Sequence, residues 1–106
     1  MGTVKKGGRE YWNSRAQDYP RYKEGEDGLE AWVLRLAHEH GVDFKGKSVL
    51  DVGCGSGKFT IRIAREAASV LGTDISDEML RILKEDAAAQ GLANIECVCA
   101  GWDAFA

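Results

Sequence analysis

A glycine-rich loop between a strand-like segment and a helical segment constrains the fold of this chain more than any other feature. The β-rich run 48–52 leads into glycines at alternate positions, Gly53, Gly55 and Gly57, and a helical pattern begins at Phe59. Glycine has no Cβ, so the backbone can turn tightly and a ligand can lie against bare peptide. The helix start adds unpaired N–H groups and a partial positive charge. The sequence therefore predicts a site for a cofactor with a carboxylate or phosphate end.

The string Leu-Asp-Val-Gly-Cys-Gly-Ser-Gly at 50–57 resembles the first signature of class I S-adenosylmethionine-dependent methyltransferases without a mismatch. The strand and helix that the motif needs flank it on both sides. The resemblance implies S-adenosylmethionine as the cofactor, with Asp51 orienting its methionine amino end through water. It also implies that the loop lines the methionine moiety. The candidate loop residues are Gly53, Cys54, Gly55, Ser56 and Gly57.

A second mark stands at Asp74, which follows the β-like run 68–73. In dinucleotide-binding βαβ units, an acid about twenty residues after the glycine loop accepts hydrogen bonds from ribose hydroxyls. The resemblance implies the same role on the adenosine ribose. The alternative is that Asp74 is a plain residue at a helix N-terminus, because 76–78 has the composition of a cap and first turn.

The resemblance also implies contacts to the adenine ring. Ile75 and Met79 would flank the ring in the continuation after Asp74. The family places an acid after the third strand, to meet the adenine amino group, but here that position falls near Gly101. Trp102 or Asp103 would take this role; the alternative is that Trp102 only packs and Asp103 is solvated.

An aromatic segment lies near the N-terminus, within a leader and lid-like region assigned to 1–28. Trp12, Ala16 and Tyr19 match a Trp-x-x-x-Ala-x-x-Tyr pattern that resembles the segment covering the cofactor in small-molecule methyltransferases. An aromatic face over a sulfonium would add cation–π attraction. The alternative, favoured slightly for Trp12 and Tyr19, is that both side chains pack this helix onto the sheet edge.

The order of expected elements predicts an α/β fold, a Rossmann-like doubly wound parallel sheet with only its first three strands. Helices are expected at 9–19, 29–40, 57–67 and 76–90, and strands at 48–52, 68–73 and 95–99. Leu29, Trp32 and Leu36 recur at helical spacing and predict a core-facing stripe. Residues 29–106 would form part of a seven-stranded methyltransferase domain. We therefore expect the chain alone to be inactive, with no catalytic residue assignable.

The composition of the chain limits the binding partners and the cellular environment that we expect for it. The 106 residues are 44% hydrophobic and 29% charged, with a net charge of −3, which gives no general attraction for nucleic acid. No apolar run approaches the roughly 20 residues that span a bilayer. Cys54, Cys97 and Cys99 suggest no disulfide framework or metal site, and unpaired thiols suit the cytoplasm. Cys97 and Cys99 would share one strand face as packing residues.

Three functions remain open at this stage. The first is the S-adenosylmethionine-binding part of a methyltransferase that acts on a small molecule. The second is a non-catalytic cofactor-binding or dimerising half-domain, in which a second copy pairs with the exposed sheet edge. The third is an NAD- or FAD-binding unit, but its fingerprint places the third glycine at position 58, where this chain has Lys58.

Overall fold

The computed structural model describes residues 8–25 and 28–101. Its elements in chain order are α1 (Arg9–Arg15), α2 (Leu29–Glu39), β1 (Ser48–Val52), α3 (Lys58–Ala64), β2 (Ser69–Asp74), α4 (Asp77–Ala89) and β3 (Ile95–Cys99). The three strands form one parallel sheet in the order β1-β2-β3. The predicted α/β, Rossmann-like fold is confirmed.

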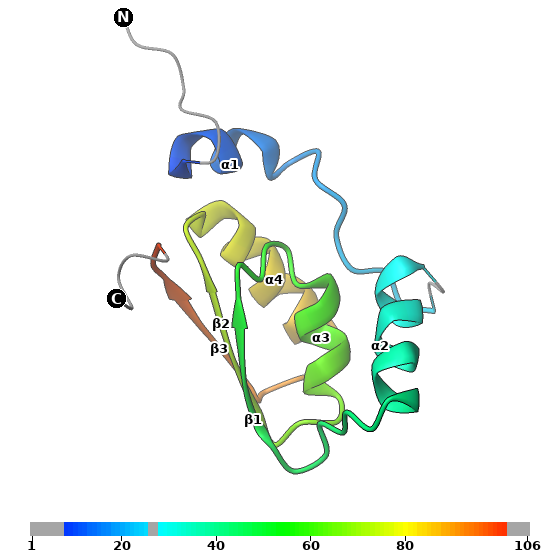
Figure 1. The fold of residues 1–106 in the computed structure, drawn as a ribbon. Coiled ribbons are helices and arrows are strands. Elements are labelled where there is room, and N and C mark those ends of the chain that lie inside the picture. The colour runs from blue at the N-terminus through cyan, green and yellow to red at the C-terminus, as the bar shows by residue number, and fades with distance from the viewer. Residues whose placement is uncertain (1–7, 26–27, 102–106) are drawn as a thin grey trace, which may run out of the picture.

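Each strand is joined to the next by a helix, and α3 and α4 cover the same face of the sheet (Figure 1). Right-handed crossovers that advance in one direction along a sheet put their helices on one face. α2 lies outside α3, and α1 lies beyond the carboxyl ends of β1 and β2. The second helical layer of a doubly wound sheet is not seen among the described residues.

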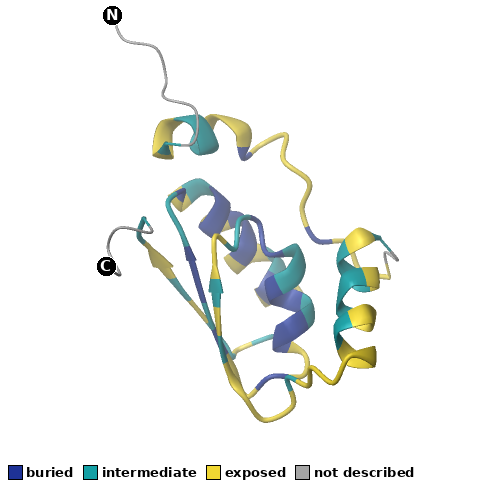
Figure 2. Cartoon of the chain, viewed as in Figure 1, coloured by how far each residue is buried: buried dark blue, intermediate teal, exposed yellow. Residues whose placement is uncertain are grey.

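The core lies between the sheet and its two covering helices, where the buried residues gather (Figure 2). Val70 is aligned with Val49 on one side and with Ile95 on the other, so these apolar side chains form a row on the helix-covered face. Ile61 of α3 and Leu83 of α4 are fully buried in the same layer. This packing fixes the loop between β1 and α3 relative to β2.

The opposite face of the sheet carries no helix in the described part of the chain. Leu50 and Val52 of β1 and Val98 of β3 remain exposed there, at 55%, 43% and 40% of their possible surface. β1 and β3 are the two edge strands of the described sheet. The expected pairing of a second copy at such an edge stays a prediction. No helix in the described ranges is long and apolar enough to cross a bilayer.

The predicted core-facing stripe on α2 is wrong. Trp32 is 54% exposed and Leu29 is 66% exposed, and Leu36 is also exposed. The helix instead turns Leu34 toward the α3 side of the core, where Leu34 packs against the buried cluster that includes Ile63 and Ala64. Helical spacing identified an amphipathic helix but not which of its faces meets a neighbour.

Two helices end three or more residues earlier than the sequence predicts. α1 stops at Arg15, and residues 16–18 form a turn before Pro20. α3 stops at Ala64 because Asn94 ends it from another part of the chain. The Asn94 amide Nδ2 donates to the carbonyls of Ala64 at 2.8 Å and Ala67 at 3.0 Å. A long-range cap of this kind leaves no local sequence signal.

Candidate functional site

The site is built at the carboxyl ends of β1 and β2. The N–H groups of Gly53 and Cys54 donate to the carbonyl of Thr73 at 2.8 and 2.9 Å, which holds the glycine loop against the tip of β2. Gly53 and Gly55 have φ angles of 71° and 55°. At both positions an added Cβ would meet open space. Substitution there is limited by backbone strain, and the peptide surface is left bare for a ligand.

The third glycine of the loop has a different function. Gly57 has a φ of 92° and forms the N-cap of α3. A Cβ at this position would lie 2.1 Å from Cδ1 of the buried Leu83 side chain. Gly57 is buried and is not part of the cavity wall described below, so its role is to let α3 and α4 pack closely.

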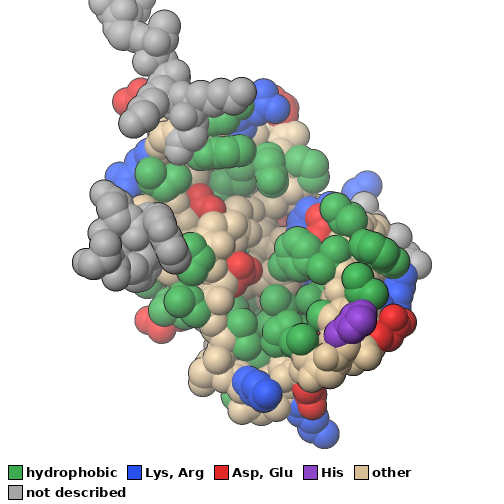
Figure 3. Space-filling view, viewed as in Figure 1, with side chains coloured by type: hydrophobic (Ala, Val, Ile, Leu, Met, Phe, Trp, Pro, Cys, Tyr) green, Lys and Arg blue, Asp and Glu red, His purple; other side chains and the backbone are tan. Residues whose placement is uncertain are grey.

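A cavity of about 450 Å³ opens beside the loop. This volume is within the range of roughly 300–1,000 Å³ that is typical of small-molecule sites. Its lining residues are Trp12, Tyr19, Val52, Gly53, Gly55, Thr73, Asp74, Ile75, Met79, Ala100 and Gly101. Figure 3 shows this face hollowed below α1, with hydrophobic side chains around acidic ones. The cavity brings together six of the predicted site residues, which are Tyr19, Gly53, Gly55, Asp74, Ile75 and Met79.

Asp74 is the last residue of β2 and is not part of α4. One carboxylate oxygen, Oδ2, accepts from the N–H of Gly55 at 2.9 Å, and the other, Oδ1, accepts from the N–H of Ser76 at 2.9 Å. Ser76 is the N-cap of α4, and its hydroxyl accepts from the N–H of Met79. Each Asp74 oxygen has further acceptor capacity, and the side chain is half-buried in the cavity wall.

Asp51 lies next to the cavity without lining it. Its side chain is on the helix-covered face, where Oδ2 accepts from the hydroxyl of Thr60 at 2.7 Å. Burial raises the pKa of Asp51, the Thr60 hydrogen bond opposes this shift, and the negative charge of Asp74 adds to it. The predicted contact of Asp51 with a methionine amino group is not tested by this geometry.

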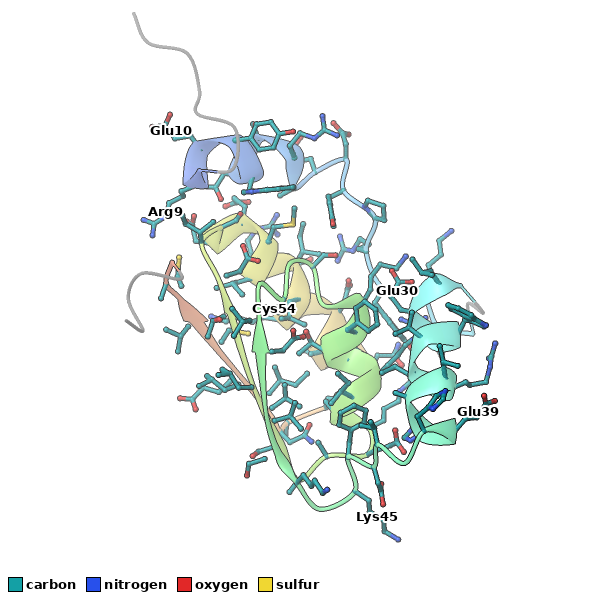
Figure 4. All side chains as sticks on the ribbon, in the orientation of Figure 1. Arg9, Glu10, Glu30, Glu39, Lys45 and Cys54 are labelled. Carbon is teal, nitrogen blue, oxygen red and sulfur yellow. The ribbon has the colours of Figure 1, made fainter. Side chains whose placement is uncertain are left out.

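Cys54 and Ser56 of the predicted loop set also turn away from the cavity. Cys54, labelled in Figure 4, packs against the central core, and burial raises the pKa of its thiol. Ser56 is buried and donates through its hydroxyl to the carbonyl of Pro20 at 2.6 Å, which ties the loop to the N-terminal segment. Trp102, the remaining predicted site residue, and Asp103 lie outside the described residues.

Cys97 and Cys99 share a strand face as expected, but only Cys97 packs against the core, while Cys99 is exposed. Burial raises the pKa of Cys97. All three cysteines have free thiols. Within the described ranges, no group of three His, Cys, Asp or Glu side chains is arranged to hold a metal ion.

The other five lining residues are Trp12, which the sequence placed in the lid-like segment, and Val52, Thr73, Ala100 and Gly101, which were not among the predicted site residues. Trp12 does pack on the molecule, but against the buried cluster of Ala16, Met79 and Ile82, so its neighbour is α4 and not the sheet edge that the alternative interpretation named. It also lines the cavity, so packing and site roles coincide. Val52 ends β1 and Thr73 is the next-to-last residue of β2, and both lie beside the loop. Their position at strand termini was the signal available in the sequence.

Comparisons with known proteins agree with this architecture. The family model for the methyltransferase domain matches residues 49–106. The ubiquinone biosynthesis O-methyltransferase of Acinetobacter baylyi is 33% identical over 86 residues, which is 81% of this chain and 34% of that protein. The 23S rRNA (uracil(1939)-C(5))-methyltransferase of Hahella chejuensis is 43% identical over 51 residues, or 48% of this chain and 11% of that protein.

A solved structure also aligns with the fold. The magnesium protoporphyrin IX methyltransferase of Synechocystis, with bound S-adenosylmethionine, is similar with a TM-score of 0.59 at 25% identity. The alignment covers 87% of this chain and 51% of that one. The chain thus belongs to the methyltransferase domain family, which confirms the resemblance seen at the glycine loop. The matched part spans 34% of the Acinetobacter relative and 11% of the Hahella relative.

Proposed function

We propose that this chain forms the S-adenosylmethionine-binding part of a methyltransferase that acts on a small molecule. The observation that carries the proposal is the cavity in which Gly53, Gly55 and Asp74 converge. Membership of the methyltransferase domain family supports this assignment, and so does the similarity to a relative solved with S-adenosylmethionine.

The lining residues fit the chemistry of this cofactor. Gly53 and Gly55 offer bare peptide at positive φ, where an amino-acid moiety can lie without meeting a side chain. Asp74 has acceptor capacity for ribose hydroxyls. Ile75 and Met79 give an apolar wall suited to an adenine ring. When bound, the cofactor supplies an electrophilic methyl group on its sulfonium.

Two aromatic side chains on the N-terminal side complete the wall. Trp12 and Tyr19 line the cavity with ring centroids 6.1 Å apart and an interplanar angle of 86°. Aromatic faces attract cations by about 0.5–2 kcal/mol. We propose that these rings stabilise the positive charge of the bound cofactor and exclude water above it.

The small-molecule acceptor is proposed from the relative named for ubiquinone biosynthesis. A relative named for 23S rRNA makes RNA the alternative outcome of an acceptor screen. Tyr19 and Asp74 are the titratable side chains among the described lining residues.

Methyl transfer from this cofactor depends mainly on how the acceptor is positioned. We therefore expect the 106-residue chain alone to give little or no turnover, and robust turnover of a small-molecule acceptor would contradict this.

Cytoplasmic localisation is part of the same proposal. The three cysteines are free thiols, and Cys54 and Cys97 are partly buried within the molecule. Unpaired thiols are typical of a reducing compartment. Detection of the labelled chain in cell fractions would test the assignment, and recovery in an oxidising compartment would contradict it.

The cofactor assignment is tested at Asp74. A carboxylate that binds ribose hydroxyls contributes about 1.5–3 kcal/mol per charge-assisted hydrogen bond. Asp74→Asn should therefore weaken S-adenosylhomocysteine binding by about ten- to a hundred-fold. The amide oxygen of the Asn side chain can still accept one backbone N–H, so the fold should be retained. Calorimetric titration and thermal melting measure the two effects separately.

Glu96→Gln is the matched control, because Glu96 is an exposed acid on the adjacent strand and is not in the cavity wall. This variant should bind like the wild type. Asp74→Ala removes the carboxylate oxygens that accept from the N–H groups of Gly55 and Ser76, and it should also lower the free energy of unfolding by about 1–2 kcal/mol. Unchanged affinity in a folded Asp74→Asn variant would show that Asp74 only organises the turn.

A further inference from the structure

Asn13 makes an unusual set of contacts for a residue on a short N-terminal helix. Its side-chain oxygen Oδ1 accepts from the hydroxyl of Ser76 at 2.5 Å and from the N–H of Glu78 at 3.4 Å. Its side-chain nitrogen Nδ2 donates to Asp77 Oδ1 at 2.9 Å. One amide therefore uses both ends on three consecutive residues that lie more than sixty positions away.

These three residues directly follow the cofactor-binding turn proposed above. Ser76 donates its N–H to Asp74, and the Ser76 hydroxyl that donates to Asn13 also caps α4. Asn13 is thus linked to the Asp74 carboxylate through one residue. The Ser76 hydroxyl already accepts from the N–H of Met79 and so caps the helix. The fold of α4 therefore does not depend on Asn13 to satisfy the Met79 N–H group.

The same helix carries one of the aromatic lining residues. Trp12, the neighbour of Asn13, lines the cavity and packs on Met79 of α4. Arg9, shown at the underside of α1 in Figure 4, donates to the carbonyl of Ile75 at 2.9 Å. α1 contacts α4, and the hydrogen bonds of Arg9 and Asn13 join α1 to the turn before α4.

We propose that Asn13 is a positioning residue of the cofactor site, whose amide sets both the Trp12 side of the cavity and the turn that presents Asp74. This inference rests on the function proposed above. A change at Asn13 would act on binding without touching the cofactor, because Asn13 itself is not in the cavity wall.

The lowered pKa of Asp77 supports the importance of its hydrogen bond with Asn13. The hydrogen bond from Asn13 is the main cause that lowers the pKa of Asp77, and its own backbone N–H adds to the effect. Arg9 is the cation that contributes to the same shift. The amide nitrogen of Asn13 therefore meets an ionised carboxylate at neutral pH, which is a charge-assisted hydrogen bond.

The test measures S-adenosylhomocysteine binding by calorimetry in the full chain. Asn13→Ala should weaken binding by about five- to twenty-fold, as expected for the loss of one hydrogen-bonded anchor. Ser14→Ala is the matched control: Ser14 is on the same helix, and its hydroxyl donates to the carbonyl of Tyr11 within α1. It should bind within two-fold of the wild type.

A rescue experiment separates positioning from general damage to α1. Asn13→Asp places a second carboxylate beside Asp77 and should weaken binding at least as much as Asn13→Ala. In the double variant with Asp77→Asn, the amide at position 77 donates to the carboxylate at position 13, which restores the hydrogen bond in the reverse direction. Its affinity for S-adenosylhomocysteine should recover to within about two-fold of the wild type. Wild-type affinity of Asn13→Ala, or no recovery in the double variant, would overturn the proposal.

Hydrogen exchange in the absence of ligand distinguishes this inference from the proposed function. Asn13→Ala should speed exchange at the N–H groups of Gly55 and Ser76, both of which donate to Asp74, and along α1. If the wild type fails to bind S-adenosylhomocysteine but exchange speeds up as described, the cofactor assignment falls and the positioning role stands. Unchanged exchange in a folded Asn13→Ala variant overturns the positioning role.

Discussion

Gly57 belongs both to the glycine loop and to the packed core, so a substitution there tests both. Its φ of 92° and the 2.1 Å approach of a Cβ to Leu83 Cδ1 both oppose any side chain. Gly57→Ala should lower the free energy of unfolding by about 2–5 kcal/mol, the sum of left-handed strain and overpacking. Chemical denaturation measures the change.

Gly91 provides the control for Gly57. It has a φ of 70°, but a Cβ there would meet nothing within 4 Å. Gly91→Ala should cost only the strain, about 1–2 kcal/mol. Equal destabilisation by the two substitutions would show that the contact with Leu83 does not limit position 57.

The sequence predicted part of the site at the residue scale. Gly53, Gly55 and Asp74 were found because positive φ and a strand-end acid leave local signals, and the structure places them together. Cys54 and Ser56 were included with them because a motif string does not say which way each side chain points. Their side chains face the core and Pro20 instead.

At the scale of elements, a histidine attaches the end of α2 to the turn that follows α3. The His38 ring contacts the carbonyl of Val42 through Nδ1 at 2.7 Å and Glu66 Oε2 through Nε2 at 3.0 Å. Both partners are acceptors, so this geometry suits the doubly protonated ring. The Val42 carbonyl first, then the Glu66 hydrogen bond and the charges of Glu66 and Asp43, raise the pKa of His38, while desolvation lowers it.

This contact predicts a pH-dependent stability. Since the folded chain holds the His38 proton more tightly than the unfolded chain, the stabilisation is complete below the unfolded pKa of about 6.5. It is lost as the pH rises through the higher folded pKa. Urea denaturation of the wild type and His38→Gln should show a stability difference at pH 5.5 that shrinks by pH 8.5.

His40→Gln is the control, because His40 is the exposed C-cap of the same helix. Its difference from the wild type should not follow the same pH course. A His38→Gln effect that is constant with pH would show that the ring acts by packing against Phe44 rather than by its charge.

Sequence patterns predicted the elements better than their environments. β1 and β3 have the predicted bounds, and the other elements differ at their ends. The prediction of buried residues was wrong for α2, where Trp32 is exposed although its helical spacing is that of a core-facing residue. Spacing reports that a helix has an apolar face, whereas the neighbour of that face is decided by tertiary packing.

For the whole molecule, the described sheet has one covered face and one bare face. Leu50, Val52 and Val98 are exposed on the bare face. The matched part of this chain covers 30% and 34% of the length of two curated relatives. The fold class was predictable because a βαβ order allows few topologies. The partner of the bare face was not predictable from the sequence, because the interactions of a sheet face depend on residues distant in sequence.

The central claim is the identity of the cofactor, and one pair of titrations tests it most directly. Gly57 and Lys58 give the loop a G-x-G-x-G spacing, whereas dinucleotide binding favours a glycine at position 58. The purified chain should therefore bind S-adenosylhomocysteine more tightly than NAD in calorimetric titrations under the same conditions. An NAD affinity equal to or tighter than that for S-adenosylhomocysteine would contradict the account.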